Sequence, residues 1–105
     1  MAYVPRIVDS VLDEVFDSLP AIALEGAKGV GKTATAAQRA VTIYELDRVE
    51  QRQLLESDYR RIEDADKPLL LDEWQLLPET WDRVRRSVDS GAQGGSYLLT
   101  GSAAV

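Results

Sequence analysis

A short glycine-rich stretch constrains the fold of this 105-residue chain more than any other feature. Residues Gly26–Thr33 read GAKGVGKT, between the apolar run Ala21–Leu24 and an alanine-rich segment that begins at Lys32. Glycines let the backbone curl so that successive N–H groups point at one anion, and a helix that starts there adds further free N–H groups. The stretch therefore predicts a buried strand, an anion-binding loop and a helix, in that order along the chain.

The spacing inside this stretch gives most of its residues a role. Gly26-x-x-x-x-Gly31-Lys32-Thr33 is a complete Walker A motif, in which the lysine reaches the β- and γ-phosphates of a nucleotide and the threonine hydroxyl binds magnesium. We expect ATP with Mg²⁺ rather than GTP, because the chain contains no Asn-Lys-x-Asp guanine-binding motif. The predicted nucleotide-binding residues are Gly26, Ala27, Lys28, Gly29, Val30, Gly31, Lys32, Thr33 and Ala34. A flexible glycine loop without a ligand is the alternative interpretation.

Two acids follow a second apolar run, Leu69–Leu71, well downstream of the glycine-rich stretch. This is a Walker B pattern, in which Asp72 would bind Mg²⁺ directly or through water. Glu73 would orient and polarise the water that attacks the γ-phosphate. Leucines followed by acids can also be a solvated strand end, but the Walker A motif upstream favours the functional interpretation. The Asp-Glu ending indicates hydrolases that have an additional strand and a catalytic glutamate.

The last predicted strand, Tyr97–Thr100, is followed by Gly101 and Ser102. In hydrolases of this kind a strand lies between the Walker A and Walker B strands, and a polar residue at its tip senses the γ-phosphate. We prefer Ser102 for this role, with Thr100 as the alternative; either side chain could instead cap the strand end. The predicted catalytic residues are therefore Glu73, Lys32 and Ser102, and the predicted metal ligands are Thr33 and Asp72.

Strands and helices alternate from Ala21 onward, which predicts right-handed crossovers and a parallel sheet covered by helices on both faces. The expected fold is an α/β P-loop NTPase with about four strands in the spatial order 2-3-4-1, truncated before a fifth strand. We expect strands at residues 21–24, 41–44, 69–71 and 97–100. We expect helices at residues 7–19 and 32–40, one or two within 48–62, and another from Pro78 to Ser90.

Composition limits the chemistry that this chain can perform. The chain has no cysteine and no histidine, which excludes disulfides, thiolate metal sites and imidazole catalysis. Any catalysis must use carboxylates, lysine, hydroxyls and a hard cation. The net charge of −6 argues against nonspecific nucleic-acid binding. No apolar run is long enough for a membrane span and the N-terminus resembles no secretion signal, so we expect a cytoplasmic protein.

Together these motifs resemble the N-terminal, nucleotide-binding part of an AAA+-type ATPase family of bacteria and archaea. Members of that family carry an uncharacterised C-terminal region that is sometimes nuclease-like. The resemblance covers nearly the whole chain and rests on Pro5-Arg6, GAKGVGKT, LLLDEWQLLPETWDRVRRSVD and YLLTGSA. The chain has Lys28-Gly29 where the family often has Arg-Gln, and Trp74 where the family often has isoleucine.

The resemblance implies that residues 1–105 are a single, incomplete ATP-binding domain. A fifth strand, an arginine finger and a helical lid would follow Val105. Without the fifth strand, the strand at 21–24 would be an exposed edge, and exposed edges recruit partner strands. We therefore expect self-association through this edge. We also expect weak binding and slow hydrolysis, because an arginine finger contributes roughly 10³–10⁵ in rate.

Three functions compete on these grounds. The first is an ATPase that converts hydrolysis to ADP and phosphate into conformational change. The second is a nucleotide-dependent binding or switch module with negligible turnover. The third, a small-molecule kinase of the P-loop type, is disfavoured, because the chain has no arginine-rich lid signature and the pair Asp72-Glu73 fits hydrolysis better.

Overall fold

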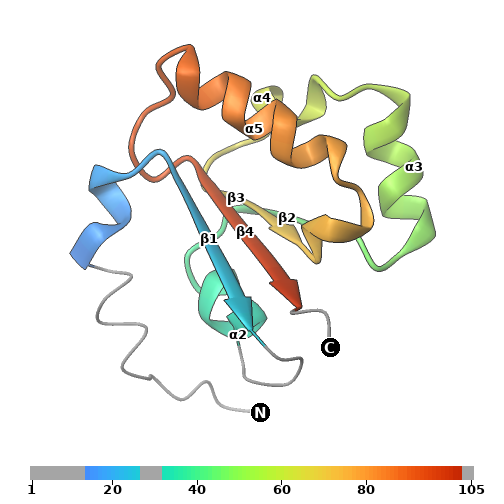
Figure 1. The fold of residues 1–105 in the computed structure, drawn as a ribbon, viewed down its shortest axis with the longest axis horizontal. Coiled ribbons are helices and arrows are strands. Elements are labelled where there is room, and N and C mark those ends of the chain that lie inside the picture. The colour runs from blue at the N-terminus through green and yellow to red at the C-terminus, as the bar shows by residue number, and fades with distance from the viewer. Residues whose placement is uncertain (1–13, 27–31, 103–105) are drawn as a thin grey trace.

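A parallel sheet of four strands organises the computed structural model, which describes residues 14–26 and 32–102 (Figure 1). The elements in chain order are η1 (Phe16–Ser18), β1 (Ala21–Gly26), α2 (Lys32–Ala37), β2 (Thr42–Glu45), α3 (Val49–Ser57), α4 (Arg61–Asp64), β3 (Leu69–Asp72), η2 (Trp74–Leu76), α5 (Glu79–Asp89) and β4 (Tyr97–Ser102). The strands lie in the order β1-β4-β3-β2, and every neighbouring pair is parallel. This is the predicted order 2-3-4-1 read from the other edge, so the fold prediction is confirmed.

Helices cover both faces of the sheet, as the alternating pattern predicts. Figure 1 shows α2 on one side of the sheet and α5 on the other. Side chains alternate between the two faces along the central strands β3 and β4. On the α2 face, Leu70 and Leu98 form a small buried cluster with Ala36. On the other face, Leu71 and Leu99 belong to a larger buried cluster to which α3, α4 and α5 contribute.

Strand pairing moves several boundaries away from their predicted positions. The strand expected at 21–24 extends to Gly26, and the strand expected at 97–100 extends to Ser102, because these two segments pair along their whole length. β2 begins at Thr42, one residue late, since it pairs with Leu69–Asp72. α2 ends at Ala37 rather than at residue 40. After Ala37 the α-helical pattern stops, because the backbone N–H of Arg39 donates to the carbonyl of Ala36, only three residues earlier.

Several sequence predictions fall partly or wholly outside the described residues. Only the end of the helix expected at 7–19 is described, and there Phe16–Ser18 form a 3₁₀ turn before Pro20. Residues 27–31 of the glycine-rich stretch and residues 103–105 also lie outside. In the part that is described, no helix is long and apolar enough to cross a membrane.

β1 lies at one edge of the sheet that the described residues form. The position expected for the strand at 21–24 is therefore confirmed. Recruitment of a partner strand by this edge stays a prediction, for which sedimentation at several protein concentrations is the measurement.

Candidate functional site

The register of the parallel strands brings the predicted site residues to one edge of the sheet. Gly26, the last residue of β1, pairs with Ser102, the last residue of β4. Two residues earlier on β4, Thr100 pairs with Asp72, the last residue of β3. Parallel strands end on the same side, and Figure 1 shows the arrowheads of β1 and β4 side by side. The start of the predicted phosphate loop, the candidate sensor and the acid of the second motif thus share the carboxyl edge.

The chain leaves the sheet through a sharp turn at Glu73. Its backbone has φ 58° and ψ 50°, which is the left-handed conformation, and η2 follows immediately. Residues other than glycine held in sparsely populated backbone regions cost about 1–3 kcal/mol and concentrate at functional sites. The backbone N–H of Glu73 donates to Oγ1 of Thr100 at 3.3 Å, which ties the turn to β4. The turn keeps this glutamate directly beside Asp72, at the strand end.

Within the part of the chain that the structure describes, Ser102 and Gln75 donate hydrogen bonds to the carboxylate of Glu73. The hydroxyl of Ser102 lies 2.9 Å from Oε1 and 3.1 Å from Oε2. The amide Nε2 of Gln75 donates to Oε2 at 2.6 Å. The carboxylate is largely buried, with 7% of the residue exposed, so its orientation is set by protein groups. Ser102 and Glu73, both predicted as catalytic, are therefore in contact.

The carboxylate of Asp72 has its own partner on β4. Thr100, which is fully buried, donates its hydroxyl to Oδ1 of Asp72 at 2.5 Å. Asp72 itself is 8% exposed. Hydrogen bonds to a charged acceptor are shorter and stronger than those between neutral groups. The hydroxyl of Thr100, the alternative candidate for the sensor, is thus directed to the aspartate, and Ser102 lies nearer the start of the loop.

Replacing Thr100 by valine is expected to destabilise the fold while keeping its shape. The change removes the donor from a buried carboxylate, for which a loss of about 1–3 kcal/mol is the usual range. Urea denaturation measures it. Thr42→Val is the matched control, because the hydroxyl of Thr42 makes no side-chain hydrogen bond within the described residues. Equal losses in the two variants would show that the bond to Asp72 contributes nothing.

Four of the predicted nucleotide-binding residues are among the described residues. Gly26 ends β1, and Lys32, Thr33 and Ala34 form the start of α2. The other residues of the predicted set, Ala27, Lys28, Gly29, Val30 and Gly31, lie outside the described residues. The roles predicted for the side chains of Lys32 and Thr33 stay predictions.

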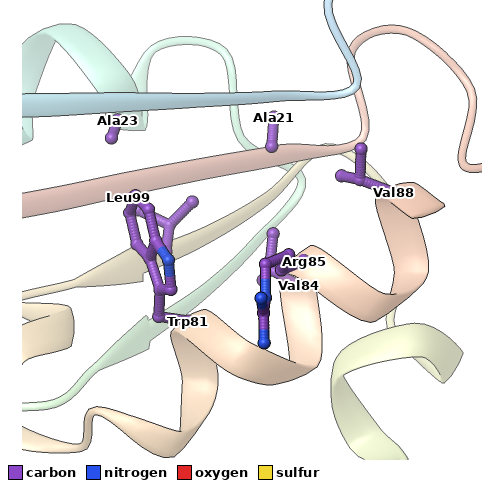
Figure 2. Close-up of a pocket in the computed structure, with 7 residues that line it drawn as sticks. All are labelled: Ala21, Ala23, Trp81, Val84, Arg85, Val88 and Leu99. Carbon is purple, nitrogen blue, oxygen red and sulfur yellow. The ribbon is translucent and has the colours of Figure 1, made fainter.

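A separate cavity of about 240 Å³ lies between α5 and the face of the sheet that β1 and β4 form (Figure 2). Its lining residues are Ala21, Ala23, Trp81, Val84, Arg85, Val88 and Leu99. Trp81 is 41% exposed, and its ring packs against that of Trp74 with the centroids 4.7 Å apart. The cavity is almost entirely apolar and smaller than the roughly 300–1,000 Å³ of most small-molecule sites. The polar groups converge at the carboxyl edge instead, and we take that edge as the candidate site.

Gln75 is the functional candidate that sequence reasoning missed. It follows Asp72-Glu73 in an otherwise apolar stretch, Trp74 to Leu77, and this isolated amide was the only available signal. Periodicity could not identify its partner, because the contact depends on the left-handed turn at Glu73.

A comparison of the sequence with models of protein families assigns most of the chain to a known family. Residues 18–105 match a family model described as an AAA domain. The match spans β1, the glycine-rich stretch, both acids and β4. No curated protein and no solved structure matches the chain in the corresponding searches.

Proposed function

The chain thus belongs to the AAA domain family, a nucleotide-binding class of P-loop proteins, and from that premise we propose that it hydrolyses ATP with Mg²⁺ to drive conformational change. One observation carries the proposal furthest. The carboxylate of Glu73 is held at the carboxyl edge by Ser102, the residue that pairs with Gly26 at the start of the glycine-rich stretch. Glu73 is thus a buried carboxylate near the start of the predicted phosphate-binding loop, and this position supports a role in activating water.

Binding would rest on the glycine-rich stretch and on the start of α2. The backbone N–H groups of residues 26–34 would surround the phosphates, and the ammonium of Lys32 would lie on the β- and γ-phosphates. Mg²⁺ characteristically takes one or two carboxylates together with water and substrate phosphate oxygens. Asp72 fits this donor set, as a carboxylate at the strand end that Thr100 already orients, and Thr33 would add its hydroxyl. The ion would neutralise charge that develops on the phosphates.

The hydrolytic step would use Glu73 and Ser102. The carboxylate of Glu73 would align a water with the γ-phosphorus and accept its proton as the new oxygen–phosphorus bond forms. The bond from the γ-phosphorus to the bridging oxygen breaks, and ADP keeps that oxygen. Ser102, which donates to Glu73 at 2.9 Å, would turn its hydroxyl to the γ-phosphate and so free one carboxylate oxygen for the water.

A nucleotide-dependent switch with negligible turnover is the second candidate. The observation that favours it is the number of protein donors on Glu73. Ser102 and Gln75 both donate to this carboxylate, so an attacking water must compete with them. In that case nucleotide binding would order the site, and hydrolysis would contribute little to the function.

Calorimetric titration of the chain with ATP tests the binding that both candidates require. We expect saturable heat at one nucleotide per chain with Mg²⁺ present, and weaker binding with a chelator, since a metal-free triphosphate keeps its full charge. GTP in place of ATP is the control for base selectivity. The absence of saturable heat at millimolar ATP contradicts both candidates.

A further inference from the structure

We propose that Gln75 is a positioning residue for Glu73, and that Gly101 leaves the space in which its side chain lies. The inference rests on the proposed function, because it concerns the carboxylate to which that function gives the central role. It adds a residue from η2 that neither the Walker motifs nor the predicted sensor includes. Gln75 acts through Glu73 and is not itself expected to touch the nucleotide.

The first support is the contact itself. Nε2 of Gln75 lies 2.6 Å from Oε2 of Glu73, a short distance for an amide donor. Hydrogen bonds to an ionised acceptor are about twice as strong as those between neutral groups. The hydroxyl of Ser102 approaches both carboxylate oxygens. If Ser102 turned to a γ-phosphate, Gln75 would still donate to the carboxylate and help to keep it in place.

The second support is the position of Gly101. Thr100 and Ser102, on either side of it, direct their hydroxyls to Asp72 and Glu73. Successive residues of a strand face opposite sides, so Gly101 faces η2. A Cβ at this position would lie 3.0 Å from Oε1 of Gln75 and 3.1 Å from Nε1 of Trp74. A larger residue would require the ends of these two side chains to shift by a few tenths of an ångström, so glycine leaves the amide in its present position.

The third support is that this arrangement is poor for stability alone. Oε1 of Gln75 and Nε1 of Trp74 are buried, and neither has a hydrogen-bond partner among the described residues. Burying a polar group without a hydrogen-bond partner destabilises the folded state. An apolar side chain at position 75 would avoid the cost at Oε1. An apolar side chain could not form the hydrogen bond to Glu73 that the amide forms. The presence of the amide therefore indicates a role at the site.

The test is a double-mutant cycle in the full chain, read as ATP hydrolysis under single-turnover conditions. Gln75→Met keeps a similar length but removes the donor, and we expect the rate to fall about tenfold while the Kd for ATP changes less than twofold. In a Glu73→Gln background the same change should lower the rate less than twofold, because the group that Gln75 positions is already inactive. Gln53→Met, on the exposed face of α3, is the matched control.

The outcomes separate this inference from the proposed function. If Glu73→Gln lowers the rate but leaves it measurable, and Gln75→Met lowers the rate by the same factor in both backgrounds, Gln75 is only structural and the inference is wrong. If Glu73→Gln leaves turnover unchanged, the carboxylate of Glu73 is not catalytic. The proposed function is then wrong, whatever the effect of Gln75→Met.

A second readout does not require turnover. In a ¹⁵N-labelled chain, the side-chain amide signals of Gln75 are assigned by their disappearance in Gln75→Met. We expect these signals to shift in Glu73→Gln and on addition of a slowly hydrolysed ATP analogue with Mg²⁺, and to stay in place in Glu56→Gln. If the amide signals of Gln75 do not shift in Glu73→Gln, the inference is wrong, even in a chain with no measurable hydrolysis.

Discussion

Replacing Glu73 by glutamine is expected to lower the rate of ATP turnover by about 10²–10⁴-fold and to leave ATP binding intact. The amide has nearly the shape of the carboxylate, and its oxygen can still accept from Ser102 or Gln75, so the site should keep its form. An amide cannot take a proton from water, and loss of a general base costs about 10²–10⁴ in rate. Phosphate release under single-turnover conditions measures the change, with calorimetric titration for binding.

The control for this prediction is Glu56→Gln on the exposed surface of α3. It makes the same change of charge away from the carboxyl edge, so its turnover and binding should equal those of the wild type. Turnover that stays at the wild-type rate in Glu73→Gln would remove Glu73 from its proposed role. Loss of binding in the same variant would assign the carboxylate to the structure of the site instead.

Replacing Lys32 by alanine is expected to abolish ATP binding. Lys32 lies near the end of the glycine-rich stretch and is the first residue of α2, and an ammonium there would neutralise charge on the β- and γ-phosphates. We expect Kd to rise at least about 100-fold, in line with the loss of a charged contact to phosphate in a site of this kind. Titration with ATP and Mg²⁺ measures it, and circular dichroism checks that the variant is folded.

Arg86→Ala is the matched control for Lys32→Ala. It also removes one positive charge, but from the exposed side of α5, so it reports any general effect of net charge on the affinity for ATP. If Lys32→Ala and Arg86→Ala bind ATP as the wild type does, the Walker A assignment is wrong for this chain.

The order of the strands could be predicted because the two motifs indicate a class of hydrolases in which a further strand lies between the Walker A and Walker B strands. The glycine-rich stretch identifies the strand at 21–24, and the leucines before Asp72 identify a buried strand. Parallel connections in one sheet are right-handed, which leaves few topologies. The observed order β1-β4-β3-β2 agrees with the one expected. The meeting of Gly26, Ser102 and Asp72 at one edge follows from that order.

The hydrogen bonds inside the site could not be predicted in the same way. The backbone of Glu73 takes a left-handed conformation that nothing in its residue type favours, since glycine and asparagine are the usual residues there. That turn decides which atoms Ser102 and Gln75 can reach. The hydroxyl of Thr100 bonds Asp72 because β3 and β4 pair in one particular register. Periodicity predicts the face of a side chain but not its partner.

The residues at which the strands end were also not fully predictable from the sequence. β1 and β4 run to Gly26 and Ser102, beyond the apolar residues that predict them. The backbone of each strand pairs with the backbone of the other along its whole length. This pairing between segments far apart in the sequence extends both strands through residues that are small or polar. It also determines the site, since Ser102 reaches Glu73 from the last residue of β4.

The most direct test of the central claim is phosphate release from ATP by the unaltered chain, measured with enzyme in excess and with Mg²⁺ or a chelator present. We expect slow release, on the order of 10⁻⁴–10⁻³ s⁻¹ as for the intrinsic rate of a P-loop enzyme assayed without an activating partner, and its disappearance with the chelator. Release that is unaffected by the chelator, or tight ATP binding with no release above the uncatalysed background, would contradict a hydrolytic site at this edge.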